Sequence, residues 1–266
     1  MAEFSPIEWT DHTFNPWWGC TKVSAGCTNC YAETWALRYG GNLWGKHAPR
    51  RMFGEQHWQQ PLRWNRQALA QGRRFRVFCA SMADVFEDHP DVASARQRLW
   101  DVIRATPNLD WLLLTKRPEH ILAMLPAAWR MRLPDNIWIM TSVENQEQAE
   151  RRIPLLLAVP AAVRALSVEP LLSPVDLSQW LDALDWVIVG GESGQKARPL
   201  DPAWVRTIRD QCVGAGVPFF FKQWGTYAPC EKADGLDFVR SGKKAAGRML
   251  DERTWDELPR ASLPAG

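Results

Sequence analysis

The stretch that decides the fold is IWIMTSVENQEQAERRIPLLLAVPAAVRALSVE, residues 137–169. It contains two short apolar runs, Ile137–Met140 and Val163–Leu166, and each leads into a Ser-Val-Glu triplet. Near-continuous apolar runs of this length are typical of strands that are buried on both faces. Because an amphipathic segment separates the two runs, the stretch predicts a βαβ unit with parallel strands.

The same pattern recurs in four further apolar runs, each followed by polar residues. These runs are Phe75–Ala80, Trp111–Leu114, Trp186–Val189 and Val217–Phe221. A seventh strand is expected near Ile7–Trp9. The repeat predicts an α/β fold with mostly parallel strands, arranged as a partial or full (β/α) TIM-like barrel; an open doubly wound sheet is the second choice.

Helices are expected between the strands, and three segments have the required composition. They are Tyr31–Tyr39, Val92–Ala105 and Pro202–Gly214, the last with Asp201 as its N-cap. We expect one barrel-like domain over residues 1–230 and a charged C-terminal extension over 231–266. The extension contains a short helical pattern around Arg253–Leu258, and solvated surface is its expected role.

Polar residues gather at the carboxyl ends of the predicted strands, where barrel and open-sheet enzymes place their chemistry. These residues are Ser81, Asp84, Lys116, Ser142, Glu144, Glu169, Glu192 and Lys222. Any single acid among them is equally well explained as a cap of the following helix. The recurrence at adjacent strands favours a shared site.

Three cysteines, Cys20, Cys27 and Cys30, follow the first strand with the spacing C-x6-C-x2-C, so this loop opens on the same face. Glycines directly precede the first two of them, where the backbone has to turn. Three sulfurs are one ligand short of a closed zinc site, and His12 or His47 is a candidate fourth ligand. Alternatively, three thiolates hold a 4Fe-4S cluster whose fourth iron binds an amino-acid moiety such as that of S-adenosylmethionine.

The composition indicates a cytoplasmic protein with reduced thiols. The start of the chain shows no secretory signal, and no apolar run is long enough to span a membrane. The net charge of +2 argues for no partner by itself. The stretch 44–76, however, contains eight cations from Lys46 to Arg76 together with Trp44, Phe53, Trp58 and Trp64. This composition suits a nucleotide or nucleic acid as well as a solvated face over packed tryptophans.

The segment Trp9–Glu33 resembles the cluster loop of radical S-adenosylmethionine enzymes. More closely, the chain is similar to a phage- and bacteria-associated family of radical-S-adenosylmethionine-like proteins of unsettled function. The stretches that carry this resemblance are FNPWWGC, GCTNCYAE, SMADVFED, LTKRPE, SVENQ, SVEPLL, VIVGGESG and FFFKQWG.

The resemblance implies a 4Fe-4S cluster on Cys20, Cys27 and Cys30, and S-adenosylmethionine as the source of a 5′-deoxyadenosyl radical. The expected cofactor-binding residues are Ser81, Asp84, Lys116, Ser142, Glu144 and Glu192. Their position at the end of the second strand favours Ser81 and Asp84 as partners of the amino group of S-adenosylmethionine. The Gly-Gly-Glu motif at 190–192 favours Glu192 instead. An external electron donor such as flavodoxin or ferredoxin is an expected partner.

The candidate catalytic residues are Lys222, Glu169 and Cys79. Lys222 precedes Gln223 and Trp224 and points to a nucleobase, nucleotide or nucleic acid as substrate. Cys79 is a candidate hydrogen donor, although a small core residue is the simpler interpretation. Two other functions stay open: a zinc-binding nucleic-acid-binding protein without radical chemistry, and a barrel enzyme that uses its acids and Lys222 for polar chemistry.

Overall fold

The computed structural model describes residues 5, 7–232 and 235–259. Seven parallel strands follow the order β1-β4-β5-β6-β7-β8-β9, so the predicted α/β fold with a partial (β/α) barrel is confirmed. The chain divides into two compact units, residues 1–141 with 154–162 and residues 142–153 with 163–266. Helix α6 (Gln146–Leu157) contributes residues to both units.

The first unit contains four strands of the sheet and their helices. The strands are β1 (His12–Thr13), β4 (Phe75–Cys79), β5 (Leu109–Thr115) and β6 (Ile137–Ser142), with a separate pair β2 (Trp17–Trp18) and β3 (Arg51–Met52). The helices are α1 (Tyr31–Tyr39), α2 (Glu55–Trp58), α3 (Gln60–Ala70), α4 (Ala93–Arg104) and α5 (Ile121–Met124).

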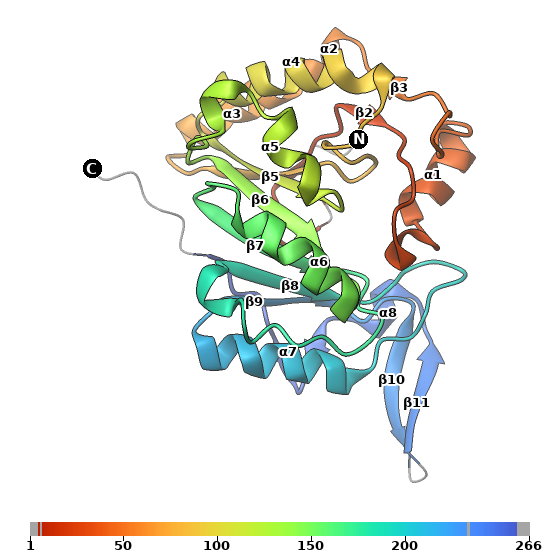
Figure 1. Ribbon diagram of the computed structural model, residues 1–266. Coiled ribbons are helices and arrows are strands. Elements are labelled where there is room, and N and C mark those ends of the chain that lie inside the picture. The colour runs from red at the N-terminus through yellow and green to blue at the C-terminus, as the bar shows by residue number, and fades with distance from the viewer. Residues whose placement is uncertain (1–4, 6, 233–234, 260–266) are drawn as a thin grey trace. The chain divides into compact units, whose positions relative to one another are not determined.

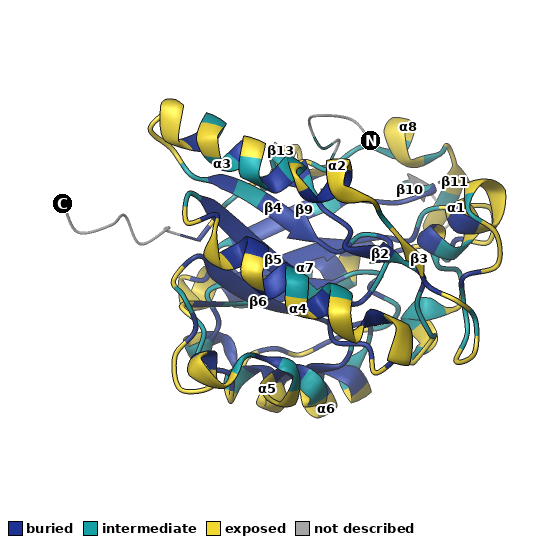
Figure 2. Cartoon of the chain, turned by 90° about the horizontal axis from the view of Figure 1, so that it is seen from above, coloured by how far each residue is buried: buried dark blue, intermediate teal, exposed yellow. Residues whose placement is uncertain are grey.

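Strands β4, β5 and β6 are buried almost throughout, because helices cover them (Figures 1 and 2). Their ladders place Phe78 opposite Leu112 and Leu113 opposite Ile139. Helix α3 packs on β4 and β5 and buries Trp64. Both faces of each strand meet other side chains, and this is why the sequence of each strand is continuously apolar.

The first strand begins at His12, three residues after the end of the expected segment Ile7–Trp9, so that prediction was wrong in position. Strand β1 pairs His12 with Val77. Trp9 is buried against Phe78 with ring centroids 4.8 Å apart, as a core side chain and not as part of the ladder. The Thr10 hydroxyl, which donates to the Arg76 carbonyl at 2.8 Å, fixes the turn before the strand.

The second unit contains β7 (Val163–Val168), β8 (Trp186–Gly190) and β9 (Phe219–Gln223), which pair in parallel. Helix α7 (Pro202–Ala215) begins as predicted, because the Asp201 carboxylate accepts from the Ala203 N–H at 2.8 Å. It ends at Gly216, whose φ of 70° favours glycine. The remaining elements are β10 (Tyr227–Lys232), β11 (Gly235–Arg240), α8 (Lys243–Ala246), β12 (Met249–Leu250) and β13 (Arg253–Thr254).

The C-terminal segment differs from its prediction. Arg253–Thr254 form strand β13 with β12, so the helix expected around Arg253–Leu258 is wrong. The segment continues along the edge of β9, where the Phe221 N–H donates to the Trp255 carbonyl at 2.9 Å. An apolar edge strand needs such cover, and this need overrides the helical composition of the tail. Of the expected extension, residues 233–234 and 260–266 lie outside the described chain.

Candidate functional site: the cysteine loop and the strand ends

The cysteine loop begins with a turn that only glycine fits. Gly19 has a φ of 115°, and a Cβ there would lie 2.6 Å from the Leu43 carbonyl oxygen. Cys20 then forms an isolated bridge with Trp44. A 3-10 turn ends at Cys27, and Cys30 is the N-cap residue of α1. The three thiols are free of disulfides and half-buried.

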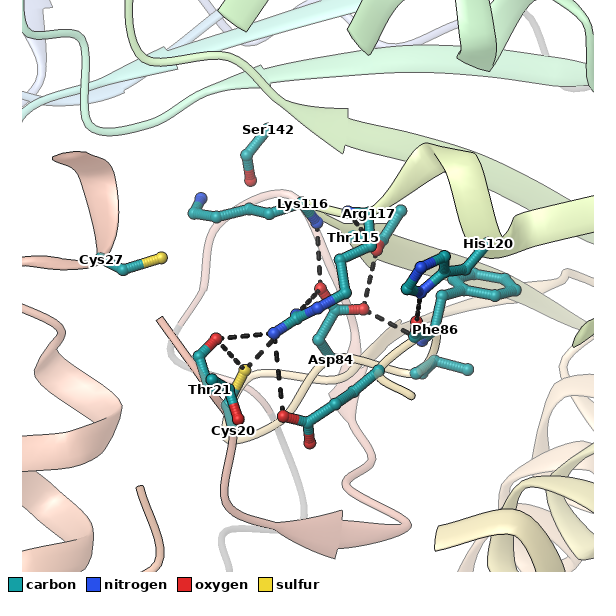
Figure 3. A network of polar contacts seen from close by, with 12 residues as sticks. Cys20, Thr21, Cys27, Asp84, Phe86, Thr115, Lys116, Arg117, His120 and Ser142 are labelled. Carbon is teal, nitrogen blue, oxygen red and sulfur yellow. Dashed lines mark hydrogen bonds and ion pairs between the residues drawn. The ribbon is translucent and has the colours of Figure 1, made fainter. Parts of the chain in front are cut away.

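Cys30 lies at the positive end of α1. Burial raises the pKa of its thiol, while the N–H groups of Glu33 and Ala32 oppose that change. The charge of Cys27 raises the same pKa further and the charge of Lys116 lowers it, so both side chains act on this sulfur. In Figure 3 the Lys116 side chain extends toward Cys27.

Cys20 faces a buried guanidinium instead. The Arg117 Nη1 lies 3.7 Å from the Cys20 sulfur and donates to the Asp84 carboxylate at 2.7 Å, while Nη2 donates to the Thr21 carbonyl at 2.6 Å (Figure 3). Burial raises the pKa of Cys20 to about 12; Arg117 opposes this rise, and the carboxylates of Asp84 and Glu87 add to it. Arg117 is thus placed to stabilise negative charge on this sulfur.

A second buried arginine holds the same segment. Arg50 forms a two-point ion pair with Glu87, with distances of 2.9 and 2.8 Å. Its Nη2 also donates to the Thr21 hydroxyl at 3.1 Å, and its Nη1 donates to the Leu43 carbonyl at 3.2 Å. Cys20 and Thr21 are therefore held by two guanidinium groups that come from distant parts of the chain.

The donor chemistry of the loop fits an iron–sulfur cluster. Three free thiols share one loop, and the cations Arg117 and Lys116 balance the negative charge that thiolate ligation brings. Across the described residues, no three His, Cys, Asp or Glu side chains converge closely enough to hold a single metal ion. The thiolates of a polynuclear cluster each bind a different iron and stand farther apart than the ligands of one ion.

Neither histidine considered as a fourth zinc ligand gains support. The His12 ring is buried and stacked on Trp64, with ring centroids 4.3 Å apart. His47 lies exposed in the loop after Trp44. Cys20, Cys27 and Cys30 as the ligand set stay a prediction.

Asp84, predicted to bind S-adenosylmethionine, is already engaged by four donors. They are the Thr115 hydroxyl at 2.7 Å, the Arg117 guanidinium at 2.7 Å, and the Lys116 and Phe86 N–H groups, both at 3.0 Å. These contacts give Asp84 a positioning role for the end of β5. Its direct contact with a cofactor stays a prediction.

Ser81 is held through neighbours of the cysteine loop. Its hydroxyl accepts from the Asn15 amide at 3.1 Å, and its carbonyl accepts from the Tyr31 hydroxyl at 2.9 Å. Cys79 is fully buried at the end of β4, and burial strongly raises its pKa. The burial favours a core role for Cys79; its role as a hydrogen donor stays a prediction.

In the second unit, the structure brings Glu169 and Lys222 together at the ends of β7 and β9. The Lys222 ammonium lies 2.5 Å from the Glu169 carboxylate. Gly190 lies beneath this pair, since a Cβ there would be 3.1 Å from the Glu169 oxygen. Gly191 is needed for another reason: its Cβ would collide with the Trp224 carbonyl at 2.0 Å. Close packing against Glu169 and Trp224 thus explains why glycine stands at positions 190 and 191.

The other two predicted acids of the second unit, Glu144 and Glu192, each pair with an arginine. Glu144 is fully buried and pairs with Arg152 at 3.1 Å, and Glu192 pairs with Arg198 at 2.7 Å. The pKa of Arg198 is raised first by Glu192 and in smaller part by Glu144, so both predicted acids act on one guanidinium. Ser142 is buried, and its carbonyl accepts from Arg152 at 2.8 Å.

Sequence reasoning overlooked Arg50, Glu87, Arg152 and Arg198 as residues of the site. Glu87 and Arg117 do lie within the stretches SMADVFED and LTKRPE. Arg50 gave no signal of its own, because it stands among cations of the basic stretch. Its partner is 37 residues away, a pairing that no local pattern marks.

Several side chains of the basic stretch 44–76 are buried or form ion pairs within the protein. Arg50 is buried, Arg73 pairs with Asp11 at 3.0 Å, and Arg74 pairs with Asp110 at 2.8 Å. Of its aromatic residues, Trp58 and Trp64 are core side chains. The exposed cations that are left are Lys46, Arg51, Arg63 and Arg66. A nucleic-acid partner for this stretch stays a prediction.

No helix within the described part of the chain has the length and apolar character to cross a membrane.

No curated protein matches the chain. Among solved structures, a point mutant of spore photoproduct lyase is similar, with a TM-score of 0.44, 11% identity, and coverage of 85% of this chain and 67% of that one. The family model described as "Protein of unknown function (DUF5131)" matches residues 4–259, and the chain therefore belongs to this family.

Proposed function

We propose that this protein is a radical S-adenosylmethionine enzyme that acts on a nucleobase, a nucleotide or a nucleic acid. The observation that carries the proposal is the cysteine loop: three free, half-buried thiols between the turn at Gly19 and the start of α1, with the Arg117 guanidinium at Cys20. Cys20, Cys27 and Cys30 would hold a 4Fe-4S cluster. When bound, such a cluster supplies the electron that cleaves the sulfonium bond of S-adenosylmethionine.

The chain's own residues have defined tasks in this proposal. Arg117 and Lys116 offset negative charge at the thiols, and the Lys116 ammonium is a partner for the carboxylate of S-adenosylmethionine. Asp84 orients Arg117 and the backbone of Lys116. The pair of Lys222 and Glu169 at the strand ends of the second unit is the candidate for holding or moving a substrate proton.

The test is anaerobic reconstitution followed by counting of iron and sulfide. We expect about four irons per chain and release of 5′-deoxyadenosine when S-adenosylmethionine and a reductant are added. Cys20→Ala, Cys27→Ala and Cys30→Ala should each lose the iron. Cys212→Ala is the matched control, because this buried thiol belongs to α7, and it should keep the iron.

Two outcomes would overturn the proposal. A colourless protein with stoichiometric zinc would assign the loop to the zinc-binding, nucleic-acid-binding alternative. A reconstituted cluster that never yields 5′-deoxyadenosine would leave an iron–sulfur protein with another activity.

A further inference from the structure

Helix α1 carries an unusual exposed face directly after the cysteine loop. Tyr31, Trp35 and Tyr39 are 54%, 49% and 58% exposed, and we call these three residues the aromatic stripe. Residues spaced by four lie on one face of a helix. Single exposed apolar residues are ordinary, but three aromatic rings along one face indicate a contact surface.

The face of α1 next to the stripe is packed and anchors it. Ala32 and Ala36 are buried in a cluster with Leu43 and Met82, and the Tyr31 hydroxyl donates to the Ser81 carbonyl at 2.9 Å, so the helix is held at the edge of the stripe. The rings of Trp35 and Tyr39 support each other, with centroids 4.6 Å apart. The stripe is therefore built on a packed helix and does not depend on a loop.

The chemistry of the stripe fits unpaired nucleotides. Thr34 and Arg38 are its neighbours on the same face, whereas Leu37, the exposed aliphatic residue of α1, lies on another face. Tyr, Trp and Arg are enriched at protein interfaces too, so the choice of nucleic acid depends on the charges beside the rings. Aromatic planes with an arginine are the usual platform for stacked bases, which offer a π-face whatever their sequence.

The charges around the stripe suit phosphates. Glu33, the only acid of α1, pairs with Lys22 at 2.6 Å. Arg38 is exposed beside the stripe on the same helix. Arg51 lies over the Trp18 ring at 5.0 Å, and that ring borders Gly40 at the end of α1. Cations thus accompany the rings without a competing carboxylate on the helix.

We propose that the aromatic stripe binds single-stranded DNA or RNA by stacking unpaired bases on Tyr31, Trp35 and Tyr39. The inference rests on the proposed function in taking nucleic acid as the substrate, and it moves the binding surface from the basic stretch to α1. Because Cys30 directly precedes Tyr31, one end of the stripe adjoins the candidate cluster loop. The helix spans about 12 Å, which gives room for a short run of bases.

The test is fluorescence anisotropy of labelled oligothymidylate and oligouridylate of about 12 nucleotides with the full-length protein, before and after cluster reconstitution. Loss of one stacked base is worth about tenfold in affinity. We expect Trp35→Ala and Tyr39→Ala each to weaken binding by about that factor and Trp35→Phe to retain most of it. The two oligonucleotides show whether DNA or RNA is preferred.

Leu37→Ala is the matched control, since Leu37 is 60% exposed on the same helix, and it should leave binding unchanged. Arg38→Gln should flatten the salt dependence by about 0.7 in the log–log slope, the value for one phosphate contact to a single strand. Circular dichroism of each variant checks that α1 is retained.

Several outcomes would overturn the inference. One is no binding to either oligonucleotide, and another is an equal loss of binding in Trp35→Ala and Leu37→Ala. The others are a homodimer that Trp35→Ala dissociates, and a Trp35→Ala variant that keeps oligonucleotide binding but is no longer reduced by flavodoxin. Because the binding measurement needs no cluster, it stands apart from the iron count. A protein that binds iron but not oligonucleotides would contradict only this inference.

Discussion

At the scale of single residues, four buried charges hold the segment that carries Cys20. Arg117 pairs with Asp84, and Arg50 pairs with Glu87; all four side chains are at most 7% exposed. Removing one partner of such a pair leaves an uncompensated buried charge and typically costs about 3–5 kcal/mol. Both arginines also bind Thr21, so the position of the neighbouring thiol depends on them.

Gly19 offers a sharp test of how tightly this segment is packed. Gly19→Ala places a Cβ 2.6 Å from the Leu43 carbonyl and 2.7 Å from the Arg50 side chain. Gly45→Ala is the matched control, because its φ of 122° is similar but no atom lies within 4 Å. Backbone strain costs both variants about 1–3 kcal/mol, and the collision should add about 1–3 kcal/mol for Gly19→Ala alone. Urea unfolding measures the loss of unfolding free energy in both variants. Equal losses would show that the loop relaxes to accommodate the added methyl group.

At the scale of elements, strand β5 begins with a buried acid. Asp110 is the second residue of β5, and its carboxylate forms an ion pair with Arg74 at 2.8 Å. Burial raises its pKa to about 6, more than Arg74 and Arg76 lower it. An acid whose pKa is higher in the folded protein than in the unfolded chain binds extra protons on folding between those two values. Its effect on stability is therefore opposite to that of the usual salt-bridged carboxylate.

We expect this carboxyl to make the protein less stable as the pH rises from about 4 to about 6, with no further change above that window. Because one pKa unit corresponds to about 1.4 kcal/mol, its contribution is of order 2 kcal/mol. Asp110→Asn removes the titration. The difference in unfolding free energy between wild type and Asp110→Asn, measured by urea at both ends of the window, should change by that amount. A difference that is independent of pH would contradict the assignment.

At the scale of the whole molecule, the C-terminal segment completes the second unit. The Phe221 N–H donates to the Trp255 carbonyl, and the Trp186 indole donates to the Glu257 carbonyl, both at 2.9 Å. Asp251 adds ion pairs with Arg206 and Arg209 on α7. Without these contacts, the edge of β9 would present unpaired backbone groups.

Truncation tests this role. A chain that ends at Arg248 loses the contacts of the Trp255 segment, and at about 1 kcal/mol for each lost hydrogen bond it should unfold at lower urea concentration. Its open β9 edge should also raise light scattering. A chain that ends at residue 259 keeps every one of these contacts and serves as the control. Equal unfolding midpoints for the two chains would show that the tail is dispensable.

Much of the fold could be predicted because its signals are local. Six of the seven strands were placed by runs such as Ile137–Met140, and α7 was placed by Asp201 and Pro202. These signals reflect which faces of an element are buried and how its first turn is capped. The first strand and the tail were misplaced, because the position of β1 is set by its partner β4 and that of the tail by the edge of β9.

The sequence by itself determined the periodic strands, the polar residues at their ends and the spacing of Cys20, Cys27 and Cys30. Only the tertiary structure decided which charge meets which: Arg117 reaches Cys20 across 97 positions, and Arg50 leaves the basic stretch to pair with Glu87. The physical reason is that periodicity and capping act within a few residues. The partner of a buried charge, in contrast, is fixed by how distant segments pack, and the cost of leaving it unpaired enforces that choice.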